Sequence, residues 1–167
     1  MPEPLNPADF PVEIHRNGRH PEPIDEDEWL YCRFDPAFAQ PNSDHIDPLH
    51  VKLIPCPDLS SNRSRFSKPW HVLCPLAKFG NYLVFRFRKQ DLPATVQGDG
   101  KGAPVHYVKT EHDPEEYNYS HCETRVYRNG VRIGGHLKPG PKDKLRLIFG
   151  SILVRERSAD ATPPAQV

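Results

Sequence analysis

The residues best suited to chemistry lie together in one short segment, His121-Cys122-Glu123-Thr124-Arg125. In a β-strand alternate side chains share a face, so an imidazole, a carboxylate and a guanidinium would stand in one row, about 6.5–7 Å apart. These groups suffice for metal-independent phosphodiester cleavage, in which a base, an acid and a charge-stabilising cation act together. We therefore expect catalytic roles for His121, Glu123 and Arg125, with His112 as a second acid. The alternative is a solvated strand face on which Glu123 pairs with Arg125.

A second polar segment, Ser60–Ser67, combines small hydroxyls, an amide and two arginines ahead of an expected helix start. Such groups in a loop before a helix form a suitable cradle for a phosphate. From this loop and from the segment upstream of His121 we expect the following ligand contacts: Ser60, Asn62, Arg63, Arg65, Asn118 and Tyr119. The alternative is a polar loop whose serines only cap the following turn.

Metal chemistry finds little support in the spacing of the cysteines and histidines. The four cysteines form no CxxC pair, and the i, i+3 pair His71 and Cys74 lacks the two further convergent ligands that zinc needs. A zinc deaminase motif also fails, because no cysteine follows Cys122. We expect no metal and no cofactor, and the cysteines are interpreted as buried thiols.

A further enzyme class follows from the order of three residues. Arg33, then Ser60 or Ser61, then Glu123 match the order in which one class of ADP-ribosyltransferases arranges its NAD site. That class carries an acid or glutamine two positions before the glutamate, where this chain has His121. An ADP-ribosyltransferase-like enzyme is kept as an alternative.

The elements that position these residues indicate an α+β fold. Apolar alternation and turn residues predict strands at Glu28–Phe34, His50–Ile54, Asn81–Arg88 and Pro104–Lys109, and a hairpin over Ser120–Ile133 around Asn129-Gly130. A short helix is expected after Ser67, a single helical turn at Asp113–Glu116, and an amphipathic helix over 141–156. The sum is a curved antiparallel sheet of about five strands with the C-terminal amphipathic helix on one face.

Length and composition favour one domain. The chain has 167 residues, 37% of them hydrophobic, and 20 prolines, and its mean hydropathy is −0.69. We expect an extended, acidic, Pro-rich arm over residues 1–25, a single domain over 26–157 and a disordered tail over 158–167. No apolar run approaches the ~20 residues that span a bilayer, and the N-terminus lacks the pattern of a signal peptide. A cytoplasmic protein with no membrane partner is the expectation.

Charge is unevenly distributed along the chain. Residues 1–60 carry 12 Asp/Glu and 4 Lys/Arg, whereas residues 61–167 carry 10 Asp/Glu and 18 Lys/Arg. A basic second part favours an anionic partner such as RNA or a nucleotide. The alternative is that the acidic N-terminal part neutralises the basic part within one molecule.

The blocks LSSNRSRFSKPWHVL and EHDPEEYNYSHCETRVY resemble a pattern found in a family of small uncharacterised bacterial proteins. In it a Ser-x-Asn-Arg-x-basic-aromatic-Ser-x-Pro block precedes an Asp-Pro-…-Asn-x-x-His-x-Glu block. The resemblance covers roughly residues 29–127 and carries no mechanism. It implies a bacterial protein in which Asn62, Arg63, Asn118, His121 and Glu123 contribute to one site.

Two classes of function follow from these observations. The first is a site for a phosphate-bearing partner, either RNA or a nucleotide, in a nuclease-type toxin or defence component. The second is a non-catalytic adaptor that docks on a larger protein through its N-terminal arm. Whether the protein is an enzyme stays open at this stage.

Overall fold

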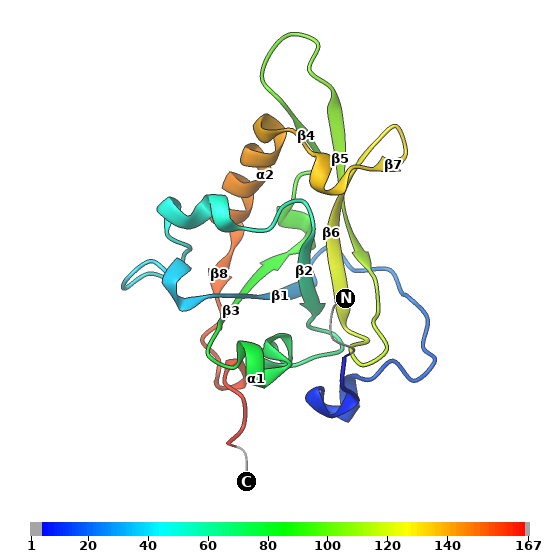
Figure 1. Ribbon diagram of the computed structural model, residues 1–167, viewed down its shortest axis with the longest axis vertical. Coiled ribbons are helices and arrows are strands. Elements are labelled where there is room, and N and C mark those ends of the chain that lie inside the picture. The colour runs from blue at the N-terminus through cyan, green and yellow to red at the C-terminus, as the bar shows by residue number, and fades with distance from the viewer. Residues whose placement is uncertain (1–4, 166–167) are drawn as a thin grey trace.

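The computed structural model describes residues 5–165, so the first four residues of the expected arm and the last two of the expected tail lie outside it. Its strands are β1 (Trp29–Phe34), β2 (Leu59–Arg63), β3 (Leu83–Arg88), β4 (Thr95–Gln97), β5 (Val105–His112), β6 (His121–Arg128), β7 (Val131–Arg132) and β8 (Val154–Arg155). They form one antiparallel sheet in the order β4-β5-β6-β2-β1-β3-β8, with β7 paired to β6. The sheet curls so strongly that β1 runs across the direction of β6 (Figure 1). The α+β class and the curved antiparallel sheet are confirmed, with eight strands instead of about five.

One long helix covers one face of this sheet. Residues 5–165 contain α1 (Leu76–Phe79), α2 (Pro139–Ile152) and the 3-10 helices η1 (Pro7–Asp9), η2 (Val12–Ile14), η3 (Pro36–Phe38), η4 (Pro48–Leu53), η5 (Pro69–Leu73), η6 (Lys89–Asp91), η7 (Gly134–His136) and η8 (Ala159–Ala161). Helix α2 buries Leu145 and Phe149, and the Phe149 ring lies edge-on to Phe87 of β3 with centroids 5.6 Å apart. This confirms the expected C-terminal helix. The face that it covers is called the inner face below.

Strand alternation separates the two faces. On β1, Leu30, Cys32 and Phe34 are buried in the core beneath α2, and the residues between them face the other side. On this outer face Val72 and Leu73 of η5 pack against Val84 of β3 in a separate apolar cluster. The outer face is therefore only partly covered, which leaves room for pockets between the sheet and its short covering helices.

Two expectations about the region before β2 are wrong. Most of the strand expected at His50–Ile54 belongs to η4, with Ile54 as its C-cap, because the Asp47 side chain accepts the backbone N–H of Leu49 and Pro48 starts the helix. The loop expected at Ser60–Ser67 contains the central strand β2 instead. A chain segment with one apolar residue therefore occupies the middle of the sheet.

Other expectations are confirmed, with small corrections. The hairpin of β6 and β7 turns at Asn129-Gly130, whose φ angles of 51° and 76° suit a type I′ turn. The helix after Ser67 exists as η5, although Lys68 occupies its N-cap. The single helical turn expected at Asp113–Glu116 is wrong, because Glu115 and Asn118 exchange backbone hydrogen bonds across a tight turn.

The N-terminal segment packs on one end of the sheet. Phe10 and Ile14 are buried beside Cys74, and the Ile14 carbonyl accepts the backbone N–H of Tyr119 at 2.6 Å. Near the other terminus, Ala161 of η8 packs on the Val72 cluster. All four cysteines are buried and unpaired by disulfides. No helix within residues 5–165 combines the length and the apolar character needed to cross a membrane.

Candidate functional site

Arg63, one of the expected ligand residues, forms a buried ion pair on the inner face. The side chain of Arg63, at the end of β2, is fully buried and donates two hydrogen bonds to Glu28, at 3.1 and 2.7 Å. It also donates to the backbone carbonyls of Glu22 and Pro23 and to Nδ1 of His112. An arginine has five N–H donors, so these contacts use all of them. No donor of Arg63 is left for a phosphate.

His112 and Tyr119 complete this arrangement, which we call the inner cluster (Glu22, Glu28, Arg63, His112 and Tyr119). Nδ1 of His112 accepts the backbone N–H of Glu22 at 2.9 Å, and Nε2 donates to the carbonyl of Tyr119. Burial lowers the pKa of His112; the carbonyl of Tyr119 opposes this shift and the charge of Arg63 reinforces it. The Tyr119 hydroxyl donates to the carboxylate of Glu22. The inner cluster therefore joins residues 20–28 to β2, β5 and the turn before β6.

A pocket lies on the other side of the sheet, where the ends of β1, β2 and β6 meet α1 and the N-terminal segment. We call it the outer pocket; its volume is about 270 Å³. It is lined by Leu5, Phe10, Arg33, Ser60, Ser61, Asn62, Val72, Cys74, Pro75, Lys78, Phe79, Glu115, Asn118 and His121. Four residues expected at a ligand site, Ser60, Asn62, Asn118 and His121, are thus brought together.

A chain of hydrogen bonds ends at the wall of the outer pocket. The Ser120 hydroxyl donates to the amide oxygen of Asn118 at 2.6 Å, and the Asn118 amide nitrogen donates to the amide oxygen of Asn62 at 2.9 Å. The amide nitrogen of Asn62 finds no acceptor among residues 5–165, although the residue is only 2% exposed. Leaving a buried donor unpaired costs about 1–3 kcal/mol. The fold therefore holds a buried, unpaired hydrogen-bond donor in a residue that lines this pocket.

Two cations and one carboxylate line the same pocket. Arg33, near the end of β1, donates one hydrogen bond to the carbonyl of Val72 at 2.6 Å, and its guanidinium lies 3.7 Å from the ring centre of Phe79. Burial lowers the pKa of Arg33, with Glu115 opposing the shift. Neither Arg33 nor the exposed Lys78 forms an ion pair with a carboxylate among residues 5–165. The lining carries an excess of positive charge.

His121 is oriented by a backbone contact. Its Nδ1 donates to the carbonyl of Asp113 at 2.8 Å, which leaves Nε2 as the nitrogen that can accept a proton in the neutral ring. The residue is 9% exposed and pairs with Asn62 across β2 and β6. An imidazole held in this way can act as an acid or a base toward a ligand in the outer pocket.

Glu123 and Arg125 share the outer face with His121 but form an ion-pair network. Arg125 binds Asp113, Glu111 and Glu123, and Glu123 also binds Arg132 at 3.3 Å. Burial opposes the charge of Arg125, yet hydrogen bonding to Asp113 and its carboxylate neighbours outweigh that and raise its pKa. This is the paired strand face foreseen as the alternative. Neither residue lines the outer pocket.

The expected site residues thus divide into separate groups. His112, Arg63 and Tyr119 belong to the inner cluster, whereas Arg65 is largely exposed and lies 3.8 Å from Asp25. Sequence reasoning did not assign Lys78 or Glu115 to a site, and it named Arg33 only through the transferase order. No periodic pattern marks these residues, because the pocket is assembled from three strands, η5, α1, the turn before β6 and the N-terminal segment. Residues 5–165 hold no group of three or more His, Cys, Asp or Glu side chains placed to bind a metal.

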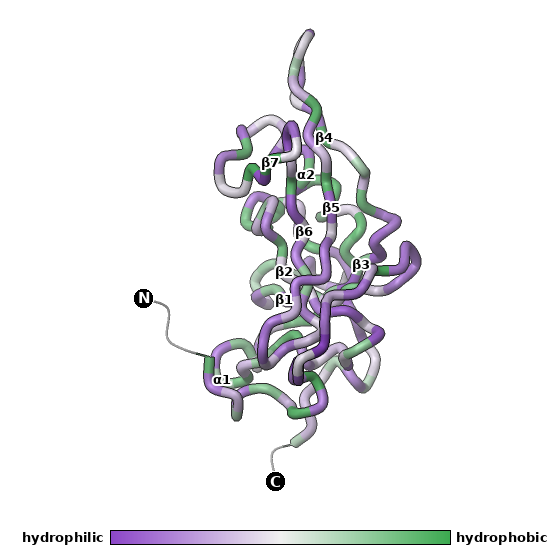
Figure 2. Tube along the Cα trace, turned by 90° about the vertical axis from the view of Figure 1, so that its right-hand side faces the viewer, coloured by the Kyte–Doolittle hydropathy of each residue, from purple (hydrophilic) through white to green (hydrophobic). Residues whose placement is uncertain are grey.

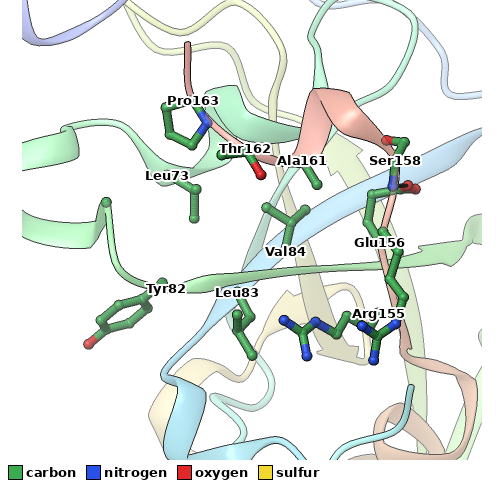
Figure 3. Close-up of a pocket in the computed structure, with 12 residues that line it drawn as sticks. Leu73, Tyr82, Leu83, Val84, Arg155, Glu156, Ser158, Ala161, Thr162 and Pro163 are labelled. Carbon is green, nitrogen blue, oxygen red and sulfur yellow. Dashed lines mark hydrogen bonds between the residues drawn. The ribbon is translucent and has the colours of Figure 1, made fainter. Parts of the chain in front are cut away.

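Another pocket, of about 280 Å³, lies between the start of β3 and the C-terminal segment. Figure 3 shows Tyr82 at one end of it and Glu156 with Ser158 at the other. The buried Glu156 is bound by Arg86 at 2.9 Å and by the backbone N–H of Ser158. Burial opposes its charge, but these hydrogen bonds lower the pKa of Glu156. The carboxylate of Glu156 is therefore already engaged by protein groups.

Comparison with known proteins found no matching family model, no matching curated protein and no matching solved structure. The interpretation of the site therefore depends on its own geometry.

Proposed function

We propose that the outer pocket binds the phosphate group of a nucleotide or of an RNA end. The observation that supports this best is the unpaired amide donor of Asn62, held in place by Asn118 and lining the same pocket as Arg33. A phosphate oxygen would accept from this donor and remove the cost of its burial. Arg33 supplies a guanidinium with unused N–H donors, which suits a bidentate contact with phosphate.

The charge and size of the pocket support a small anionic ligand. Arg33 and Lys78 outnumber Glu115, and an arginine whose pKa is lowered by burial gains from a nearby negative charge. A volume of about 270 Å³ admits a phosphate with part of its sugar, not a duplex. Glu115 lies on the exposed turn after β5, where it favours a ligand that also carries hydroxyl donors.

Titration calorimetry with ribose 5-phosphate, AMP and ADP tests this proposal. Arg33→Gln is expected to weaken binding by about 10- to 100-fold, since hydrogen bonds to charged groups contribute about 1.5–3 kcal/mol. Arg157→Gln is the matched control, because Arg157 is exposed and lies outside the pocket. The proposal fails if none of the three compounds binds, or if both variants bind equally well.

A nuclease-type activity stays a prediction that the same variants can test. His121 is oriented for proton transfer, whereas Glu123 and Arg125 are engaged with each other. Cleavage of RNA that is abolished in His121→Gln but retained in the control Arg157→Gln would support it.

The adaptor role of residues 1–25 also stays a prediction. A pull-down with the exposed Leu5 and Val12 changed to Ser tests it without removing buried Phe10 or Ile14.

One contact favours ADP-ribosyl transfer as the second candidate. Ser60 lines the outer pocket with Arg33, and its hydroxyl donates to Glu123 at 3.5 Å. With NAD bound, Arg33 would hold the pyrophosphate and Glu123 would stabilise the positive charge on the nicotinamide ribose. The bond between ribose C1′ and the nicotinamide nitrogen would break, nicotinamide would leave with the bonding pair, and water would attack C1′ and release a proton.

Release of nicotinamide from NAD measures this second candidate directly. Glu123→Gln should abolish release and leave phosphate binding in place, because Glu123 lies beside the pocket and not in its lining. Glu116→Gln is the control at an exposed carboxylate. Release that persists at the wild-type rate in Glu123→Gln excludes the assignment of Glu123.

A further inference from the structure

A second, more apolar cavity lies at the far end of the sheet from the outer pocket. It separates the β4–β5 hairpin, which extends beyond the body of the molecule (Figure 1), from the start of α2. Figure 2 shows the same hairpin projecting in the rotated view. The cavity has a volume of about 480 Å³ and is lined by Gly98, Asp99, Ala103, Pro104, His106, Lys138, Pro139, Gly140 and Pro141. Small-molecule sites are typically concave, mostly apolar and of about 300–1,000 Å³.

One buried polar residue lines this cavity. His106 on β5 is 5% exposed, and its Nδ1 has no hydrogen-bond partner among residues 5–165. The cross-strand neighbour Val96 and the inner-face residue Val108 are apolar and offer none. An imidazole nitrogen withdrawn from water without a partner is costly, so its presence in a cavity points to a group that hydrogen-bonds it from within.

The lining of this cavity favours a ligand with a flat ring. Three prolines, two glycines and an alanine supply backbone and ring surfaces without long side chains. At the rim stand the exposed Lys138 and the N-terminal end of the 14-residue helix α2, which both attract negative charge. Asp99, the acidic residue of the lining, forms an ion pair with Lys144 at 2.8 Å.

We propose that this cavity binds a planar aromatic heterocycle whose ring nitrogen or N–H hydrogen-bonds Nδ1 of His106 and whose anionic substituent lies near Lys138. The apolar walls enclose the ring, and the rim of the cavity holds the charged group. This site is separate from the outer pocket in place and in lining. It does not depend on the function proposed for that pocket.

Ligand-observed NMR and the ¹⁵N signals of the histidine rings test the site. The probes are adenine, indole-3-carboxylate and pyridine-3-carboxylate, with cyclohexanecarboxylate as the non-aromatic control. At least one heterocycle should bind at millimolar concentration or below and shift the His106 Nδ1 signal. His106→Phe keeps a ring but removes both nitrogens, and should weaken that binding at least ten-fold.

Three further variants keep the test decisive. Lys138→Gln, at an exposed position that preserves the fold, should weaken the two aromatic carboxylates and leave adenine unchanged. His136→Phe, exposed and outside the cavity, should leave all binding unchanged. Arg33→Gln should also have no effect, which separates this site from the outer pocket. The proposal is overturned if no heterocycle binds, if cyclohexanecarboxylate binds equally well, or if Lys138→Gln and folded His106→Phe bind as wild type does.

Discussion

Two arginines on neighbouring strands differ in what the chain provides for them. Arg63 of β2 is fully buried on the inner face, and the chain supplies an acceptor for each of its five N–H groups. Arg33 of β1 faces outward, and the chain supplies it with one carbonyl and an aromatic ring. The two residues share their type, but Arg63 is fully buried and Arg33 is only partly buried. The number of acceptors distinguishes a structural arginine from one that can bind a ligand.

The largest expected effect comes from the inner cluster. Arg63→Met leaves the carboxylate of Glu28 buried without its partner, which costs about 3–5 kcal/mol when one member of a buried ion pair is removed. The free energy of unfolding, measured in urea, should fall by that amount. Arg65→Met, at a side chain that is 55% exposed, should change it by less than about 0.5 kcal/mol. The double variant Arg63→Met with Glu28→Met should recover most of the loss, because no unpaired charge remains. Equal losses in the two single variants would contradict the structural role of Arg63.

The same contrast explains what the sequence could and could not predict. Apolar alternation identified β1, β3 and β6, and the Asn129-Gly130 turn identified the hairpin, because these signals are local. Strand β2 was missed because Leu59-Ser60-Ser61-Asn62-Arg63 contains a single apolar residue. Its buried Arg63 is paired with Glu28, and the amide oxygen of its Asn62 accepts from Asn118; both partners lie far away in the chain. Local patterns cannot reveal a strand whose burial depends on distant partners.

For the site, alternation places Glu123 with His121 on the outer face, as the pairing of Ser60 with Glu123 and of Asn62 with His121 records. The proximity of the two polar segments was also inferred, and β2 does lie beside β6. The sequence could not show that Arg63 turns to the inner face while Asn62 lines a pocket on the other. That division requires the strand assignment of β2, since a loop has no fixed alternation.

The next largest expected effect is the dependence of the free energy of unfolding on pH. His112 is neutral in the inner cluster, where Nδ1 accepts two hydrogen bonds, and its pKa is lowered; burial also lowers that of His71. The unfolded chain takes up protons first as the pH falls below about 6.5, so stability is fully present above that value and decreases below it. The slope can reach about 1.4 kcal/mol per pH unit for each histidine.

Urea unfolding at a series of pH values measures this slope. His112→Gln should reduce it, and His20→Gln, at an exposed histidine, should leave it unchanged. A slope that is the same in all three proteins would show that His112 is not neutral in the cluster.

Replacing Arg33 should weaken ligand binding while changing the free energy of unfolding only slightly. Arg33→Gln removes one hydrogen bond and a cation–π contact, so the free energy of unfolding should fall by only about 1 kcal/mol. Differential scanning calorimetry without ligand measures this change, and addition of AMP should then stabilise the wild type more than the variant. A loss as large as that of Arg63→Met would show that Arg33 is structural as well, and the comparison between the two arginines would fail.

The smallest expected effect is that of Glu123→Gln on the outer face, which contrasts with Glu28→Gln on the inner face. The side chain of Glu123 is 20% exposed, and the amide oxygen of Gln can still accept from Arg125 and Arg132, which both bind the same carboxylate oxygen. Glu123→Gln should therefore change the free energy of unfolding by less than about 0.5 kcal/mol, as is usual for ion pairs that water reaches, and the change should shrink further in salt. Glu28→Gln should cost several kcal/mol regardless of salt, since it leaves Arg63 charged and buried without a carboxylate. Urea unfolding of both variants at low and high ionic strength provides the measurement. If Glu123→Gln proved as costly as Glu28→Gln, the outer network would be part of the structural core, and Glu123 would be a poor choice for a catalytic carboxylate.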